Sequence, residues 1–192
     1  MKIILASSSP RRMELIKKLN CEVECISPDT DEKFDDNKSL EENILCVAAS
    51  KGMAVKAFTD LKDDQIIIAA DTSVVIGETA MGKPKNSEDA RLMLRALSGR
   101  THEVITSVFM MNNARSISFY EKTKVTFSPM SDSEIDYYIS TGEPFGKAGA
   151  YAIQGAGALF IESLEGDYYN VVGLPVNRIY NVLKNVFKAN VL

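Results

Sequence analysis

The hydrophobic pattern is densest in residues 66–76, where apolar and β-branched residues follow one another almost without interruption. Five apolar or small residues lead directly into Asp71, and four residues of strand character follow Thr72 before Gly77 breaks the run. Such a run predicts a buried strand. An ionised carboxylate there needs a cation, hydrogen bonds or a function to offset its desolvation. Asp71 is therefore either half of a structural ion pair, with Lys83 as a nearby cation, or a functional group.

Shorter hydrophobic runs predict further strands at residues 2–6 and 22–26. Residues 101–111 and 115–128 are also rich in strand-forming residues, and Asn112-Asn113 between them is a hairpin signal. Helices are predicted to begin at Ser9-Pro10, at the capping boxes formed by Ser39 with Glu42 and by Ser131 with Glu134, at Ser87 and at Pro175. Glycine-rich residues 147–174, with Gly146 directly before them, indicate tight turns or close approach to a ligand. This order predicts an α/β fold with helices packed on a long mixed sheet.

One charged residue interrupts the apolar stripe of the helix that Ser39 opens. The stripe includes Ile44, Val47 and Val55, and Lys51 falls on the same face. A lysine at such a position either extends its ammonium past the core into solvent or directs it at a bound phosphate. Both alternatives remain open at this point.

The junction between the first strand and the first helix is rich in groups that bind anions. Ser7 and Ser8 supply hydroxyls there, and Arg11 and Arg12 supply guanidinium groups. Backbone N–H groups at a helix start and the bidentate fork of arginine both suit phosphate. The alternative is that one or both arginines are solvated or pair with a neighbouring carboxylate.

Composition narrows the function classes. The chain has 192 residues and a net charge of −4, and its isoelectric point of about 5.2 argues against a protein that coats DNA or RNA. Three cysteines without paired spacing are typical of reduced thiols, and one histidine, His102, does not suggest a zinc site. We see no transmembrane run or signal peptide, and we expect a cytoplasmic protein. Neither a Walker A sequence nor a G-x-G-x-x-G motif is present.

An acidic segment, residues 29–36, precedes the second helix. Runs of this kind are usually solvated surface, although oxygen-rich loops also bind Mg²⁺. We interpret most of the segment as surface and keep Glu32 as an exception.

Four separated motifs occur in a collinear order that resembles one family. They are LASSSPRR at 5–12, ADTSVV at 70–75, GKP at 82–84 followed by LSGRTH at 97–102, and KAGAYAIQG at 147–155 with NVVGLP at 170–175. Together they resemble the Maf family of nucleoside triphosphate pyrophosphatases over almost the whole chain. The resemblance implies a single domain, 1–192, with an elongated mixed sheet, helices on its faces and two lobes around a central cleft, similar to inosine triphosphate pyrophosphatases. It also implies a homodimer.

The resemblance further implies hydrolysis of a nucleoside triphosphate between its α- and β-phosphates, with a divalent cation, Mg²⁺ or Mn²⁺. Asp71 matches the family's proton acceptor, although the sequence leaves open whether it activates water or holds the metal. The polar cleft positions of the family match Ser7, Arg12, Glu32, Lys51, Lys83 and Lys147, with Glu32 as the candidate metal ligand. The positions tied to substrate choice match Arg11, Thr72 and Gln154.

The side chain at position 154 indicates which base is selected. A glutamine offers a donor and an acceptor, which suits the pairing edge of thymine or uracil. A sister subgroup that acts on 7-methyl-GTP has Glu in place of Gln154 and Trp in place of Arg11. The chain therefore resembles the dTTP/UTP subgroup, with canonical or modified pyrimidine nucleotides as substrates. The alternative function is a nucleotide-binding regulator of cell division or septum formation, for which turnover would not be needed.

Overall fold

The computed structural model describes residues 1–30 and 33–191. Its strands are β1 Lys2–Ala6, β2 Glu22–Ile26, β3 Gln65–Ile76, β4 Thr79–Met81, β5 Thr101–Met111, β6 Ser116–Phe127 and β7 Ile161–Glu165. Its α-helices are α1 Pro10–Ile16, α2 Leu40–Ala57, α3 Ser87–Leu97, α4 Asp132–Ser140, α5 Tyr168–Val172 and α6 Val176–Asn185, and two 3-10 helices are η1 Ala148–Ala150 and η2 Ala156–Phe160. The protein is therefore mixed α/β, as the hydrophobic pattern predicts.

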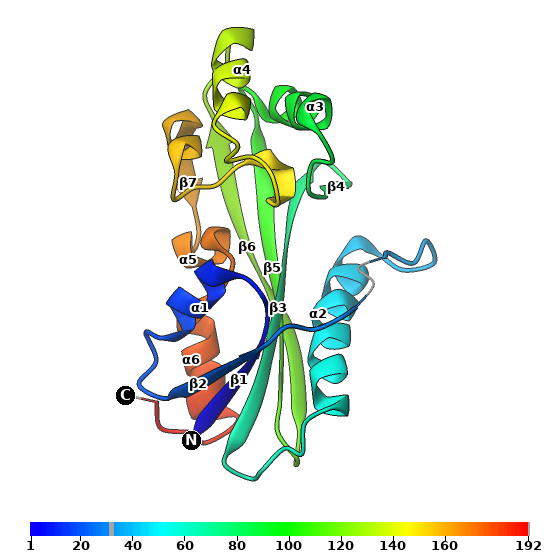
Figure 1. Cartoon of the computed structure of the whole chain (residues 1–192), viewed down its shortest axis with the longest axis vertical. Helices are drawn as coiled ribbons and strands as arrows, with labels where there is room; N and C mark the ends of the chain where they lie inside the picture. Colours follow the sequence, from blue (N-terminus) through cyan, green and yellow to red (C-terminus); the bar gives the residue numbers. More distant parts are fainter. Residues whose placement is uncertain (31–32, 192) are drawn as a thin grey trace. The chain divides into compact units, whose positions relative to one another are not determined.

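The strands of the described residues form one mixed sheet (Figure 1). The order is β2-β1-β3-β5-β6-β7, and β4 pairs with β3 outside this path. The pairs of β1 with β2 and with β3 are parallel, whereas β4 and β7 pair antiparallel with their neighbours. Parallel neighbours need crossover connections, and α1 and α2 supply them between the first three strands. The predicted hairpin at Asn112 is confirmed, because its backbone N–H donates to the carbonyl of Arg115 (3.0 Å).

The chain divides into two compact units. The first unit comprises Met1–Asp71, Thr106–Glu121 and Gly173–Leu192, and the second comprises Thr72–Ile105 and Lys122–Val172. Strands β3, β5 and β6 each contribute residues to both units. The boundary in β3 falls directly after Asp71.

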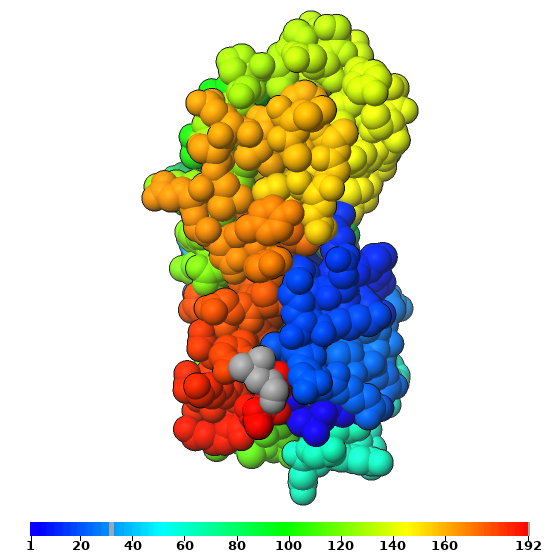
Figure 2. Space-filling model, turned by 90° about the vertical axis from the view of Figure 1, so that its left-hand side faces the viewer, coloured from blue at the N-terminus to red at the C-terminus, as the bar shows by residue number. Residues whose placement is uncertain are grey.

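In the first unit, apolar side chains of α2 pack against one face of the parallel strands. Ala48 and Val55 share a core cluster with Ile4 of β1 and with Ile67 and Ala69 of β3. In Figure 1, α2 lies on one side of these strands and α6 on the other. The C-terminal end of the chain meets the segment after α1 here, since Asn20 N donates to the carbonyl of Val191 (2.9 Å), and Figure 2 shows blue and red residues side by side.

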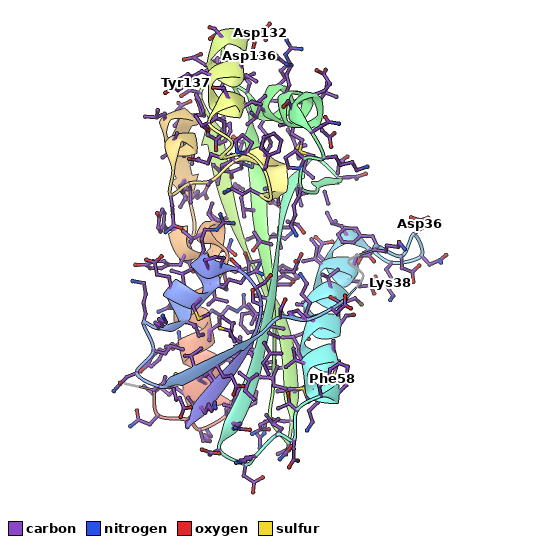
Figure 3. All side chains as sticks on the ribbon, in the orientation of Figure 1. Asp36, Lys38, Phe58, Asp132, Asp136 and Tyr137 are labelled. Atoms are coloured by element: carbon purple, nitrogen blue, oxygen red, sulfur yellow. The ribbon has the colours of Figure 1, made fainter. Side chains whose placement is uncertain are left out.

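In the second unit, α3 and α4 pack together and are joined by ion pairs at their surface. Arg91 pairs with Asp136, and Arg95 pairs with Asp132 (2.9 Å). Figure 3 shows both aspartates on α4, beside the exposed Tyr137. Beneath them, a core cluster contains apolar residues from β3, α3, β5, β6 and α4.

Local capping signals placed most helices correctly. Both predicted capping boxes are present, and Ser9 caps α1 with Pro10 as the first helical residue. The helix start at position 87 needs one correction, because the N-cap of α3 is Asn86, whose side chain accepts from the N–H of Asp89 (2.9 Å). Of the described helices, none is long and apolar enough to cross a membrane.

Candidate functional site

Asp71 forms an ion pair with Lys51, and both residues belong to the first unit. The ammonium Nζ of Lys51 lies 2.5 Å from Oδ1 of Asp71, and the side chains are 9% and 16% exposed. The cation comes from α2 because the inward face of this helix packs on β3, and Lys51 on that face reaches the carboxylate. Lys51 therefore does not extend into solvent, which excludes one of the two alternatives for this residue. Lys83, the cation suggested by its closeness in sequence, is exposed in the segment after β4.

Burial makes this pair energetically sensitive. Each charge has been largely removed from water, so each depends on the other for compensation. The pair also orients the Asp71 carboxylate, because one of its oxygens is hydrogen-bonded to the ammonium. Asp71 therefore stands in a buried strand as a fixed negative group with a defined direction.

The junction between β1 and α1 orders the predicted anion-binding groups Ser7 and Arg12. Ser7 is buried, and its hydroxyl oxygen accepts from the N–H of Ser9 (3.1 Å) and from Nη1 of Arg12 (3.5 Å). The Nε of Arg12 donates to the carbonyl of Gly173 (2.8 Å), so the guanidinium is oriented by a backbone group near the other end of the chain. Arg11 is half-buried beside it in α1.

The second unit contains the other predicted site residues that the structure describes. Thr72 is half-buried in β3, Lys147 is half-buried before η1, and Gln154 is exposed before η2. The Nζ of Lys147 donates to the backbone carbonyls of Glu143 (2.7 Å) and Phe145 (3.4 Å).

The segments that contain Lys83 and Lys147 lie side by side. The N–H of Gly149 donates to the carbonyl of Gly82 (3.1 Å), which directly precedes Lys83. Gly149 has a φ of +66°, and a Cβ built there would lie 2.9 Å from the side chain of Val74 in β3. Only glycine suits this position, because it adopts positive φ freely and lets the backbone approach the strand.

Glu32 lies outside the described residues, so its predicted role as a metal ligand stays a prediction. Within each unit the structure brings some predicted residues together: Lys51 with Asp71, Ser7 with Arg12, and the two lysine segments with the end of β3. The functional assignments of all these residues also stay predictions.

Sequence analysis missed Glu143, which organises the segment around Gln154. The carboxylate of Glu143 accepts hydrogen bonds from Tyr138, Ala156 and Gly157. A glutamate at the edge of a glycine-rich segment was the available signal, because such segments leave backbone N–H groups that need acceptors.

His102 has a structural role in the core of the second unit. Its Nε2 lies 2.8 Å from the hydroxyl of Tyr151, and its ring packs edge-on against Phe127. Burial lowers the pKa of His102 from 6.5 to about 4, so the imidazole is neutral at pH 7.

Taken together, the fold and its charged groups define an α/β protein with an ion-paired strand carboxylate and several cationic side chains suited to phosphate. A profile of one family, described as Maf-like protein, matches residues 2–186. The chain belongs to the Maf family, which confirms the resemblance seen in the four motifs.

Three curated relatives span nearly the same length as this chain, and each is named dTTP/UTP pyrophosphatase. The protein of Bacillus velezensis is 47% identical over 183 residues, covering 95% of both chains. The protein of Carboxydothermus hydrogenoformans is 48% identical over 186 residues, covering 96% of this chain and 98% of its own. The protein of Thermoanaerobacter pseudethanolicus is 43% identical over 194 residues, covering all of both chains.

Among solved structures, the chain is similar to the Ham1 protein of Staphylococcus aureus. The TM-score is 0.44 at 17% sequence identity, and the match covers 66% of this chain and 72% of the other.

Proposed function

We propose that this chain hydrolyses dTTP and UTP between the α- and β-phosphates and releases the nucleoside monophosphate and pyrophosphate. The main support comes from the three relatives named dTTP/UTP pyrophosphatase, which are 43%, 47% and 48% identical to this chain over nearly their whole lengths. The buried pair of Asp71 and Lys51 is the structural feature that best fits such chemistry, because it fixes the direction of a carboxylate.

Asp71 is the proposed acceptor for the proton of the attacking water. Its carboxylate is anchored through Oδ1, so a water at the remaining lone pairs would meet a group of fixed direction. Lys51 is the proposed positioning partner, and its ammonium also favours the approach of a phosphate. Orientation of this kind reduces the reorganisation that the reaction needs.

Cationic side chains are the proposed ligands of the triphosphate. Arg12 is already oriented by Gly173, and a guanidinium in fixed orientation suits the planar oxygens of a phosphate. Lys83, Lys147 and the hydroxyl of Ser7 are assigned to the same role. Several cations are needed because a triphosphate has several negative charges that must be neutralised as the bond breaks.

A divalent cation, Mg²⁺ or Mn²⁺, is part of the proposal. The described residues contain no group of three or more His, Cys, Asp or Glu side chains that could hold a metal ion. Mg²⁺ is commonly bound by one or two carboxylates together with substrate phosphates and water, so the proposed site does not need such a group. Glu32 is the candidate ligand, and Asp71 is the alternative, in which case it would hold the metal instead of accepting the proton. When bound, the cation would neutralise phosphate charge and make the phosphorus more open to attack.

Gln154, Thr72 and Arg11 are the proposed determinants of base choice. Gln154 is exposed, so its amide is accessible to a base. An amide donates and accepts at once, which matches the donor and acceptors of thymine and uracil. A base with the wrong pattern would leave polar groups unpaired, and such mismatches discriminate strongly.

The central experiment measures pyrophosphate release from dTTP, UTP, dCTP, dGTP, ATP and 7-methyl-GTP, with Mg²⁺ and with Mn²⁺. We expect dTTP and UTP to be preferred and thymidine monophosphate to be the product from dTTP. If the products are instead thymidine diphosphate and inorganic phosphate, the proposed cleavage between the α- and β-phosphates is wrong. A preference for 7-methyl-GTP would refute the role of Gln154. Nucleotide binding without turnover on any substrate would favour the regulator of cell division, for which no feature of the structure argues.

Assembly and location complete the proposal. We propose a cytoplasmic homodimer that binds nucleotides rather than nucleic acid. The acidic composition disfavours nucleic acid, and an odd number of cysteines fits reduced thiols in the cytoplasm. Light scattering after size exclusion should give twice the chain mass of 21.1 kDa. A mass of one chain would contradict the dimer.

A further inference from the structure

The carboxylate of Glu143, in the segment after α4, joins two other parts of the second unit. Its Oε1 accepts from the hydroxyl of Tyr138 (2.7 Å) and from the backbone N–H of Gly157 (3.0 Å). Its Oε2 accepts from the N–H of Ala156 (2.9 Å). Hydrogen bonds to an ionised acceptor are stronger than neutral ones. The side chain therefore connects α4 to the first turn of η2.

Gly155, the residue directly after Gln154, lies against this carboxylate. A Cβ built at Gly155 would overlap the carboxylate of Glu143. The close approach is possible only because glycine has no side chain. It places the backbone next to Gln154 in direct contact with Glu143.

Gln154 is consequently held from both sides. On its N-terminal side, the N–H of Ala152 donates to the hydroxyl of Tyr138 (3.2 Å), the group that donates to Glu143. On its C-terminal side, the N–H groups of Ala156 and Gly157 donate to Glu143 itself. The exposed amide of Gln154 therefore projects from a short segment whose two ends are fixed by one connected network.

The backbone of the same residue orients Lys147. The carbonyl of Glu143 accepts from Nζ of Lys147 (2.7 Å), and the carbonyl of Phe145 also accepts from it (3.4 Å). A lysine ammonium has a flexible stem, so fixed acceptors are needed to define where its charge lies. Glu143 thus contacts both the segment of Gln154 and the side chain of Lys147.

The protonation states agree with these hydrogen bonds. Partial burial acts to raise the pKa of Glu143, but hydrogen bonds from Gly157, Tyr138 and Ala156 outweigh it and hold the pKa below its usual value. Burial, followed by the hydrogen bond to Glu143, raises the pKa of Tyr138. At neutral pH the glutamate is an acceptor and the tyrosine is a donor, as the network needs.

We propose that Glu143 is a positioning residue for pyrimidine selection: its carboxylate fixes the segment that presents Gln154, and its backbone carbonyl orients Lys147. The inference rests on the proposed function, because it assigns Gln154 to the base and Lys147 to the triphosphate. Glu143 acts through these two residues, so its loss should change substrate preference and KM more than it changes the folded structure.

The test is Glu143→Gln, which keeps the size of the side chain but places an NH₂ donor where an oxygen accepts from N–H or O–H groups. The ratio of kcat/KM for dTTP to kcat/KM for dCTP should fall about tenfold or more, because the Gln154 amide is no longer held in register with the base. KM for dTTP should rise more than kcat falls. Tyr138→Phe, which removes the linking hydroxyl, should change the ratio in the same direction.

Glu134→Gln is the matched control, since Glu134 also accepts hydrogen bonds in the second unit, but from Ser131 at the start of α4 (2.7 and 2.6 Å). It should keep the wild-type ratio. Gly155→Ala is the second variant, because the added methyl group displaces the carboxylate without removing it, and it should lower the ratio as Glu143→Gln does. If Glu143→Gln does not fold by circular dichroism, Gly155→Ala and Tyr138→Phe decide the question.

Two results would overturn the inference while leaving the proposed function intact. One is an unchanged ratio in folded Glu143→Gln and Gly155→Ala. The other is an equal loss of activity on every nucleotide, which would indicate a structural role alone. A wild-type protein that releases no pyrophosphate from any nucleotide would instead contradict the proposed function itself.

Discussion

Replacing Lys51 by methionine removes the ammonium from the buried pair and keeps the length of the side chain. The carboxylate of Asp71, 16% exposed, would then lie in a buried strand without its cationic partner. Breaking a buried pair in this way costs about 3–5 kcal/mol, and the partial exposure of Asp71 favours the lower end, about 3 kcal/mol. For a chain of 192 residues this corresponds to a fall in Tm of about 6–12 °C.

The assay is urea denaturation followed by circular dichroism, with Tm measured in parallel. Lys56→Met, on the same helix, is the matched control and should change the free energy of unfolding by less than about 0.5 kcal/mol. Adding Asp71→Asn to Lys51→Met removes the unpaired charge, so the double variant should be about 1.5 kcal/mol more stable than Lys51→Met alone. This comparison separates the ion pair from the packing of the lysine stem.

Pyrophosphate release from dTTP gives a second measurement on the same variants. We expect kcat to fall at least about 100-fold in Lys51→Met and in Asp71→Asn, because each loses a proposed element of the reaction. Two results would refute the reasoning. One is a loss of stability below about 1 kcal/mol in Lys51→Met. The other is a double variant no more stable than Lys51→Met, since an uncompensated charge would then not be the cause.

Three further predictions concern other parts of the chain. The pKa of His102 is about 4 in the folded protein and 6.5 for an unperturbed histidine, so the unfolded state binds more protons as the pH falls between these values. The free energy of unfolding should therefore drop by about 2 kcal/mol between pH 7 and pH 5. Thermal melts of His102→Gln should lack this part of the drop. Arg12→Lys loses the guanidinium fork, so kcat/KM for dTTP should fall about 10-fold or more, and an unchanged value would remove Arg12 from the phosphate ligands. Gly149→Ala should lower Tm by about 4–8 °C, because the residue has a positive φ and the added Cβ would clash with the side chain of Val74. Gly142→Ala should lower Tm less, because Gly142 also has a positive φ but has open space around it.

Features set by neighbours in sequence were accessible without the structure. The capping boxes at Ser39 and Ser131 are present, because a hydroxyl and a carboxylate three residues apart satisfy backbone donors whatever surrounds them. The long strand around Asp71 and the hairpin at Asn112 are present for the same kind of local reason. The collinear motifs were sufficient to identify the family.

Some elements lacked such a local signal. Strand β4 has three residues and exists because the turn at Gly77 folds it back on β3. Strand β7 and helix α5 lie in the glycine-rich segment, where the sequence indicated only turns. Short elements of this kind are stabilised by their partners in the fold, and their own residues do not specify them.

The sequence by itself determined that Asp71 lies in a buried strand and needs compensation, since desolvation of a carboxylate is costly in any fold. Only the tertiary structure decided which cation supplies it. Lys51 is 20 residues away from Asp71 along the chain and Lys83 is 12 residues away, yet the packing of α2 on β3 selects the more distant lysine. The same holds for Glu143, whose carboxylate meets the N–H groups of Ala156 and Gly157 because α4 and η2 pack together. Long-range partners depend on which faces meet in space, and spacing along the chain does not encode that choice.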